Sequence, residues 1–421
     1  MQKKFPNSKM TLKKTWGTIN EIINKRRVKT KFPPFFEVRN EKITDKNEIA
    51  NEMNHYFSTI GQTLADEIDS TGLPSMESYL GQKPPSNFTF RPTNHDKIAK
   101  ILKDFTPKNS CGIDGISSAL VKTLTSDQLI DALVFAVNQS LTSSVFPKQL
   151  KISKIVPLFK NKGKIWHFEN WRPVALLPAL FKIYEKEIFN QIVEYFTLNS
   201  LFCENQFGFR KSRSTDDAIM MLHDKCKQLL DQRQTPFAIF LDLSKAFDTI
   251  DHSLLLKKLL FYGFDDSAIR LMSSYLSDRK QYVYIDGTAS DMRGVGVGVP
   301  QGSCLGPLLF LIYVNALPNS TDLLDSILFA DDTSLFGAFS TVSIDRNSDV
   351  VLINRELDKV HTWLNVNKLS LNVSKTKYMI FNNNRFDTTP HPTDPLIIND
   401  QKITKVLEFE FLGVVVDSEF N

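Results

Sequence analysis

The stretch Ile327–Phe336, ILFADDTSLF, places two adjacent carboxylates, Asp331 and Asp332, between two apolar runs. The flanking runs, 327–330 and 333–336, have the composition of short β-strands, so the two acids are expected at the tip of a tight hairpin. Asp is common in such turns because it tolerates unusual backbone angles. A solvated turn and a functional site both fit this stretch, and the rest of the sequence has to decide between them.

The overall composition is that of an ordinary globular protein. The 421 residues are 42% apolar and 23% charged, enough for two or three domains or one large multi-lobed domain. No apolar run is long enough to cross a bilayer, and the first ten residues have no signal-peptide core. The four cysteines have no CxxC spacing, which argues against a zinc site or a disulfide framework. We therefore expect a protein of the nucleus or the cytoplasm, neither secreted nor membrane-spanning.

The charge is unevenly distributed along the chain. Residues 1–31 carry ten Lys or Arg and one acid, whereas the net charge of the whole chain is only +4. A basic arm of this kind fits an anionic polymer as partner and also fits a solvated leader. We interpret residues 1–95 as a basic arm and linker, with one helix around Trp16, a second helix over about 41–68, and a Pro- and Ser-rich linker over 73–94.

A third carboxylate stands near the end of another apolar run. The segment Pro236–Leu243, PFAIFLDL, is typical of a buried strand, and its Asp242 precedes Asp331 by 89 residues. A buried carboxylate is costly unless a cation or a donor meets it. If the two strands are neighbours, the acids converge at one edge of a sheet, where hard oxygen ligands suit Mg²⁺ and phosphoryl transfer. The sequence has no HxExxH-like or GxxxxGK[ST] pattern, which argues against zinc-hydrolase and P-loop chemistry.

Seven segments in this order resemble those of one polymerase family. FLDLSKAFDTIDH (240–252), GVPQGSCLGPLLFLIYVNAL (298–317) and FADDT (329–333) resemble the central palm motifs of reverse transcriptases. SCGIDGIS, NWRPVALLP, NQFGFRKSRSTDDAI and WLNVNKLSLNVSKTKYMIF are similar to segments of LINE-type, non-LTR retrotransposon polymerases, the jockey-like group in particular. The likeness covers about residues 110–417. One departure is YVNALP at 313–318, where the family often has YxNDLP.

The resemblance implies a fold of the α+β class, a right-hand polymerase core with fingers and a palm whose antiparallel sheet is backed by helices. We assign residues 96–235 to the fingers, with motifs at 110–122 and 148–219, and residues 236–382 to the palm. Residues 383–421 are assigned to the end of the palm and the start of a truncated thumb. The reverse transcriptase domain then covers about 140–416. We expect the chain to lack the endonuclease domain and the complete thumb of full-length family members.

The resemblance also assigns the metal site and a sugar-selecting residue. Asp242 and Asp331 resemble the two metal-bridging aspartates, Asp332 resembles their supporting acid, and the carbonyl of Leu243 is a further candidate ligand. The implied cofactor is a pair of Mg²⁺ ions, which Mn²⁺ can replace. Phe247 resembles the bulky ring under the incoming sugar, which leaves no room for a 2′-hydroxyl and so selects deoxynucleotides.

Further residues resemble the nucleotide-binding set. Gln301 and Gly302 match the pair that lines the nucleotide and template pocket, and Arg172 matches the arginine that grips the triphosphate with its planar fork. Lys160 is a candidate for a second triphosphate contact, although a solvated hairpin lysine fits it equally well. Lys375 resembles the lysine that protonates the leaving pyrophosphate, and its alternative is a surface strand lysine.

Other polar residues of the same motifs receive weaker assignments. Gln206 and Arg210 are expected to contact the template or the primer, together with Ser214 and Thr215, although such residues also make ordinary turns. Asp248 and Asp251 are interpreted as acids at a helix start, where the helix dipole favours them, and not as metal ligands.

The function implied is RNA-directed DNA polymerisation, in which a primer 3′-hydroxyl attacks the α-phosphate of a dNTP. The implied partners are an RNA template, a DNA primer or target and dNTPs, with no membrane involved. Two other classes stay open: an RNA-copying RNA polymerase, which Phe247 disfavours, and a catalytically weak or inactive nucleic-acid-binding remnant of a mobile element, which the full set of metal-site acids disfavours.

Overall fold

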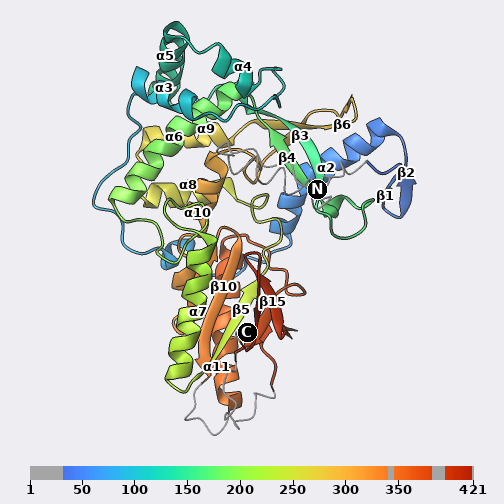
Figure 1. Ribbon diagram of the computed structural model, residues 1–421, viewed down its shortest axis with the longest axis vertical. Helices are drawn as coiled ribbons and strands as arrows, with labels where there is room; N and C mark the ends of the chain where they lie inside the picture. Colours follow the sequence, from blue (N-terminus) through green and yellow to red (C-terminus); the bar gives the residue numbers. More distant parts are fainter. Residues whose placement is uncertain (1–31, 340–345, 382–393, 420–421) are drawn as a thin grey trace, which may run out of the picture.

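The computed structural model describes residues 32–339, 346–381 and 394–419, so the helix expected around Trp16 lies outside the described residues. The described residues form a mixed α/β protein with two five-stranded sheets (Figure 1). We call the lower one the site sheet and the other the upper sheet. The site sheet has the order β14-β11-β5-β10-β9. Its strands are β5 (Thr235–Leu241), β9 (Asp325–Phe329), β10 (Asp332–Phe339), β11 (Lys377–Ile380) and β14 (Thr404–Lys405).

The site sheet is covered on both faces, which explains the unbroken apolar run of its central strand. All seven residues of β5 are buried. Phe237, Ile239 and Leu241 join the main hydrophobic core, whereas Ala238 and Phe240 join a second cluster beneath α7 (Thr215–Asp231). The main core also receives side chains from α8 (His252–Phe261), α10 (Leu305–Val314) and α11 (Arg346–Val366). The predicted buried strand is confirmed, and the sheet is antiparallel as expected except for the parallel pair β11–β14.

The upper sheet joins segments that are far apart in the sequence. Its strands are β3 (Ile152–Phe159), β4 (Trp171–Leu176), β6 (Arg279–Ile285), β7 (Thr288–Ala289) and β8 (Arg293–Val295). β3 pairs with β4 in antiparallel and with β6 in parallel orientation. The expected division of the chain at residue 235 therefore needs correction: β6–β8 come from the 236–382 segment but join the upper sheet, and α7 comes from the 96–235 segment but packs on the site sheet.

Residues 32–95 are part of the packed body, in contrast to the arm and linker expected there. The helix expected over about 41–68 is confirmed as α2 (Lys46–Asp66), and it packs against β6, β7 and β8. Phe36, Met53 and Phe88 are buried in the main core, so the linker interpretation of these residues is wrong. The other helices of the upper body are α3 (His95–Asp104), α4 (Ser118–Thr123), α5 (Asp127–Ser143), α6 (Ala179–Leu198) and α9 (Asp266–Leu276).

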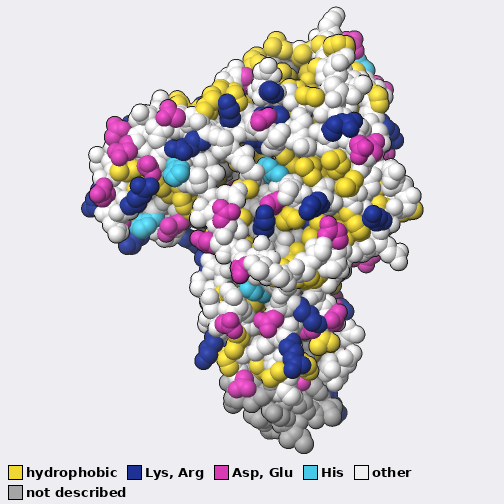
Figure 2. Space-filling view, turned by 180° about the vertical axis from the view of Figure 1, so that it is seen from behind, with side chains coloured by type: hydrophobic (Ala, Val, Ile, Leu, Met, Phe, Trp, Pro, Cys, Tyr) yellow, Lys and Arg dark blue, Asp and Glu magenta, His cyan; other side chains and the backbone are white. Residues whose placement is uncertain are grey.

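Short elements complete the described chain. Among the described residues, three antiparallel strand pairs have strands of two to four residues. They are β1 (Phe36–Val38) with β2 (Glu41–Ile43), β12 (Ile397–Ile398) with β13 (Gln401–Lys402), and β15 (Glu408–Phe411) with β16 (Val414–Asp417). Single 3₁₀ turns are η1 (Met76–Tyr79), η2 (Lys148–Lys151), η3 (Phe168–Asn170) and η4 (Leu317–Ser320). No helix among the described residues has the length and apolar character needed to cross a membrane. On the face shown in Figure 2, basic and acidic side chains are interspersed over the whole visible surface.

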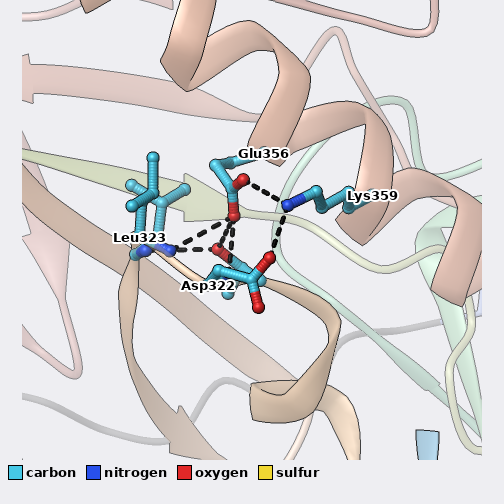
Figure 3. A network of polar contacts seen from close by, with 6 residues as sticks. Asp322, Leu323, Glu356 and Lys359 are labelled. Atoms are coloured by element: carbon cyan, nitrogen blue, oxygen red, sulfur yellow. Dashed lines mark hydrogen bonds and ion pairs between the residues drawn. The ribbon is translucent and has the colours of Figure 1, made fainter.

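A buried carboxylate ties α11 to the loop that leads into β9 (Figure 3). Glu356 accepts hydrogen bonds from the Thr321 hydroxyl at 2.6 Å and from the backbone N–H groups of Asp322 and Leu323 at 2.7 and 3.3 Å. The Lys359 ammonium bridges Glu356 and Asp322, at 2.6 and 2.7 Å. Burial alone would raise the pKa of Glu356, but the donors outweigh it and lower the pKa to about 2. The network holds the start of β9, and therefore the hairpin that follows it.

A lysine is buried where α8, α10 and α11 meet. The side chain of Lys258, on α8, is fully buried and donates to the carbonyl of Tyr313. Its ammonium lies 4.5 Å from the ring centroid of Tyr313 and 5.2 Å from that of Trp363. Burial lowers the pKa of Lys258 to about 7, because the charged form loses its hydration.

Candidate active site

The strand register brings the acids together at one edge of the site sheet. β10 pairs with β5 so that Thr333 lies opposite Leu241, and the next step of this register places Asp332 opposite Asp242. β9 and β10 are joined by a two-residue turn made of Ala330 and Asp331, because Phe329 pairs with Asp332. Asp242 thus follows the last paired residue of the central strand, and the two other acids occupy the turn and first residue of its neighbour.

The strained residue of this turn is Ala330 and not an aspartate. Ala330 has a φ of 59°, whereas Asp331 and Asp332 are not in the left-handed region. The expectation that the acids take the unusual backbone angles is therefore wrong. A left-handed conformation costs a residue with a Cβ about 1–2 kcal/mol, so the surrounding structure has to hold the turn.

The segment Asn205–Gly208 supplies this support. The Gln206 side-chain oxygen accepts hydrogen bonds from the N–H groups of Ala330 and Gly208, at 3.0 and 2.8 Å. Phe207 N–H donates to Leu328 O at 2.7 Å, so this segment runs beside β9. A Cβ on Gly208 would lie 2.3 Å from the Ala330 nitrogen, and only glycine permits this approach.

This position corrects the expected template contacts. Gln206 is 2% exposed and cannot reach a template, because its oxygen is used inside the protein to hold the turn. The Arg210 guanidinium donates to Cys203 O at 3.0 Å and lies 4.4 Å from the ring of Phe202, so it braces the same loop. Ser214 caps α7 through a capping box.

A second segment holds the backbone at Asp242. Asn372 N–H donates to Asp242 O at 2.8 Å, Ser244 N–H donates to Ser370 O at 2.8 Å, and the Thr376 hydroxyl accepts from Asp242 N–H at 3.3 Å. In this antiparallel pattern the N–H and C=O of Leu243 point away from the 370–372 segment. The Leu243 carbonyl therefore makes no backbone hydrogen bond to the 370–372 segment, and it stays a predicted metal ligand.

The three carboxylates lie close enough for the negative charge of each to affect the pKa of the others. Desolvation and the charge of Asp242 raise the pKa of Asp331, and Arg172 partly opposes this rise. Desolvation and the charges of Asp331 and Asp242 raise the pKa of Asp332 to about 6. The Lys375 ammonium lies 3.8 Å from a carboxylate oxygen of Asp242. The resemblance-based placement of Lys375 beside the metal-site acids is thus consistent with its position.

The donor set suits a divalent cation, although the acids are not closed into a cage. Within the part of the chain that the structure describes, no three His, Cys, Asp or Glu side chains are grouped closely enough to bind a metal ion. Carboxylates of like charge repel one another, and a bound cation reverses that repulsion. The oxygens of Asp242, Asp331 and Asp332 and the carbonyl of Leu243 are the hard donors that Mg²⁺ prefers.

Four cations from separate segments, Arg172, Lys160, Lys245 and Lys375, lie close to one another and near these acids. Arg172 is exposed on β4, and Lys160 follows β3 and donates to Glu169 O at 2.8 Å. Desolvation, together with the charges of Lys245, Lys375 and Arg172, lowers the pKa of Lys160 to about 8. The mutual effect shows that these four cations share one region. Lys245 was missed at the sequence level, and its place three residues after Asp242 was the available signal.

The expected sugar-selecting ring is held firmly. The half-buried ring of Phe247 stacks on Phe310, with centroids 4.7 Å apart and an interplanar angle of 28°. Its carbonyl accepts from Val299 N–H at 2.9 Å, which joins the loop after β5 to the loop before α10. Phe209 meets the ring edge-on at 6.5 Å. A ring packed in this way is a rigid wall.

Gln301 and Asp248 form a polar pair next to that wall. The Gln301 amide donates to Asp248 at 2.8 Å, and desolvation raises the pKa of Asp248. Asp248 is therefore not an acid at a helix start, in contrast to Asp251, which caps α8 by accepting from Leu254 N–H at 3.0 Å. Gly302 has a φ of 126°, and a Cβ there would lie 2.7 Å from a backbone oxygen of β4, so both the angle and the contact require glycine.

The comparisons with known proteins identify the family of this chain. The chain belongs to the reverse transcriptase (RNA-dependent DNA polymerase) family, whose profile matches residues 159–416. It is 27% identical over 397 residues to a protein described as "Probable RNA-directed DNA polymerase from transposon BS" of Drosophila melanogaster, covering 91% of this chain and 42% of that protein.

Two further relatives agree. The chain is 27% identical over 410 residues to the "RNA-directed DNA polymerase from mobile element jockey" of Drosophila funebris, covering 93% of the chain and 43% of the relative. It is 26% identical over 361 residues to the "Probable RNA-directed DNA polymerase from transposon X-element" of Drosophila melanogaster, covering 81% and 37%. The expected resemblance to jockey-like, non-LTR retrotransposon polymerases is confirmed. The chain spans about two fifths of the length of these relatives.

Proposed function

We propose that the chain catalyses RNA-templated DNA synthesis, with the site sheet as the palm and the upper sheet as the fingers. The observation that carries the proposal is the register of β5 with β10, which puts Asp242 and the Asp331–Asp332 pair at one edge of the sheet. The family membership supports the same reaction. RNA template, DNA primer or target, and dNTPs are the partners that this reaction requires.

Asp242, Asp331, Asp332 and the Leu243 carbonyl would hold two Mg²⁺ ions, or Mn²⁺ in their place. When bound, such ions supply charge stabilisation for the attacking 3′-hydroxyl and for the leaving pyrophosphate. The raised pKa values of Asp331 and Asp332 support this assignment, because a bound cation relieves the repulsion that raises them.

The chain's own cations bind and orient the triphosphate. Arg172 offers a planar fork to phosphate oxygens, and Lys160 and Lys245 add charge beside it. Lys375, 3.8 Å from Asp242, is placed to give a proton to the leaving pyrophosphate. Phe247 excludes a 2′-hydroxyl by bulk. Asp248 holds the amide nitrogen of Gln301, so the Gln301 oxygen and the glycine that follows it are presented to the nucleotide and its template base.

Primer extension on an RNA template, with dNTPs and with or without Mg²⁺, tests the proposal. We expect Asp242→Ala and Asp331→Ala to abolish extension with an intact fold. Asp325→Ala is a matched control, because Asp325 lies at the far end of β9 and its carboxylate makes an exposed ion pair at 3.8 Å with Lys225. Extension by either active-site variant would refute the metal assignment. Template binding without extension by the unmodified chain would favour a non-catalytic remnant.

A further inference from the structure

A fully buried carboxylate lies where α6, α9 and the first turn of α10 meet. It belongs to Glu185 on α6, and α6 packs against α10 (Figure 1). One of its oxygens accepts a hydrogen bond from the Tyr275 hydroxyl of α9 at 2.6 Å, and the other accepts from the Cys304 backbone N–H at 3.1 Å. The Glu185 side chain therefore joins three helices that are far apart in the sequence.

Directed donors and a nearby cation hold this carboxylate in the core. Burial raises the pKa of Glu185, and the hydrogen bonds from Tyr275 and Cys304, together with the charge of Arg279, oppose that rise. The buried Arg279 guanidinium donates to Tyr275 O at 3.2 Å and lies 5.2 Å from the ring centroid of Tyr275. A buried carboxylate with such partners is fixed in position, because any other placement leaves its oxygens without donors.

Glu185 caps α10 from a distance. Cys304 is the N-cap residue of α10, and its own side chain makes no capping hydrogen bond. The Ser303 hydroxyl accepts from Gly306 N–H at 2.9 Å, whereas Cys304 N–H donates to Glu185. A carboxylate at a helix N-terminus is also favoured by the helix dipole. The start of α10 is thus held by a side chain that lies 119 residues earlier in the chain.

The segment that Glu185 holds contains the predicted nucleotide contacts. Gln301 and Gly302 stand directly before the first turn of α10. On their other side, Gln301 O accepts from Ala175 N–H at 2.8 Å, and a Cβ on Gly302 would lie 2.7 Å from Ala175 O. Ala175 on β4 and Glu185 on α6 therefore hold the two ends of the segment 301–304.

Both supports come from one short stretch of chain, residues 171–185. Only two residues separate the end of β4 from the start of α6. The same stretch carries Arg172, the predicted triphosphate contact. One strand and the helix that follows it therefore set the position of Arg172 and, through two backbone hydrogen bonds, that of the Gln301–Gly302 pair.

We propose that Glu185 is a positioning residue, which places Gln301 and Gly302 for the incoming nucleotide by holding the Cys304 N–H at the start of α10. The inference rests on the proposed function for the identity of that nucleotide. Glu185 is fully buried and cannot touch a nucleotide, so its effect passes through the backbone of 301–304. Loss of the acceptor should weaken nucleotide binding and leave the acids of the site sheet in place.

Steady-state primer extension tests this role through the KM for dNTP and kcat. Glu185→Met has a similar length and no acceptor, so we expect KM to rise about tenfold and kcat to change by less than about threefold. Glu185→Gln keeps an oxygen acceptor for Cys304 N–H and should retain KM within about threefold. Tyr275→Phe is the matched control, because it removes the other hydrogen bond of the same carboxylate, and it should also retain KM.

Hydrogen exchange of the backbone amides gives a second readout that needs no catalysis. Mass spectrometry of a peptide that contains the start of α10 should show exchange about tenfold faster in Glu185→Met, and unchanged exchange in Glu185→Gln and Tyr275→Phe. The double variant Glu185→Met with Tyr275→Phe removes the carboxylate and one of its two donors together. It carries the same expectation, so the test does not depend on the folding of the single variant.

A residue that only stabilises the fold would give a different pattern. Its loss would lower the fraction of folded chain, and therefore kcat per mole of protein, with an unchanged KM for dNTP. That pattern, or exchange at the start of α10 as slow in Glu185→Met as in the unmodified chain, would overturn the proposal. An unmodified chain that extends no primer would instead refute the proposed function, and the exchange comparison would still decide whether Glu185 holds this segment.

Discussion

Replacement of Lys258 by methionine should stabilise the protein near neutral pH and remove a pH dependence of its stability. Lys258 is fully buried, with a pKa of about 7 in the folded state against 10.5 as the ordinary value. Each pKa unit corresponds to about 1.4 kcal/mol, so the charged form costs the folded state about 5 kcal/mol. Methionine has a similar length and no charge. The lost hydrogen bond to Tyr313 O reduces the gain in the free energy of unfolding by about 1–3 kcal/mol.

The direction of the pH effect follows from proton binding. Below pH 7 both states bind the proton and the folded state bears the full cost. Between pH 7 and 10.5 the unfolded state holds a proton that the folded state has lost, so stability increases with pH. From pH 7 to pH 9 the free energy of unfolding of the unmodified chain should rise by about 2 kcal/mol relative to that of Lys258→Met.

Urea-induced unfolding, followed by tryptophan fluorescence at several pH values, measures this difference. Trp363 lies 5.2 Å from the Lys258 ammonium and reports on this core. Lys257→Met is the control, because Lys257 is exposed on the same helix and its variant should follow the unmodified chain. A difference between the two methionine variants that stays constant from pH 7 to 9 would refute the reasoning. It would mean that the Tyr313 and Trp363 rings and the Tyr313 carbonyl keep the ammonium charged.

Three other substitutions test separate parts of the structure. Gly208→Ala should lower the rate of primer extension at saturating dNTP by tenfold or more, because the added Cβ would collide with the backbone of Ala330 and move the acid-bearing turn. An unchanged rate would show that the turn does not need this contact. Glu356→Gln should destabilise the fold by about 3 kcal/mol at neutral pH, since a pKa lowered from 4.5 to about 2 contributes stability that is present above pH 4.5 and lost as the pH falls toward 2. Urea unfolding should therefore show a loss at pH 3 that is less than about half of the loss at pH 7. Phe247→Ala should raise incorporation of ribonucleotides relative to deoxynucleotides by about 10–100-fold in single-nucleotide extension, and no gain would contradict its role as a steric wall.

The local features of the site could be predicted because they depend on neighbouring residues. The apolar run Pro236–Leu241 of β5 is buried as its pattern indicates, and the short apolar runs around the Asp331–Asp332 pair form the predicted hairpin. Both signals come from apolar runs and turn composition within about ten residues. The sequence predicted that Asp242 meets the pair if the two acid-bearing strands are neighbours, and the pairing of β5 with β10 shows that they are.

The partners of polar side chains were the part that the sequence could not supply. Gln206 was assigned to the template, yet it is buried under Ala330, and Asp248 was assigned to a helix start, yet it holds Gln301. In each case the partner is more than 50 residues away. A short polar side chain has several local uses of similar energy, and only the packing of distant segments selects one of them.

The sequence by itself determined the family, the acid-bearing strands and the order of the motifs, since these are written in contiguous residues. The tertiary structure decided which residues carry strain and which are buried. Ala330 takes the positive φ because the segment at Gln206 holds it there, and the pKa of Lys258 is lowered because burial removes the hydration of its ammonium. Burial and strain are properties of the surroundings, and those surroundings exist only once the chain has folded.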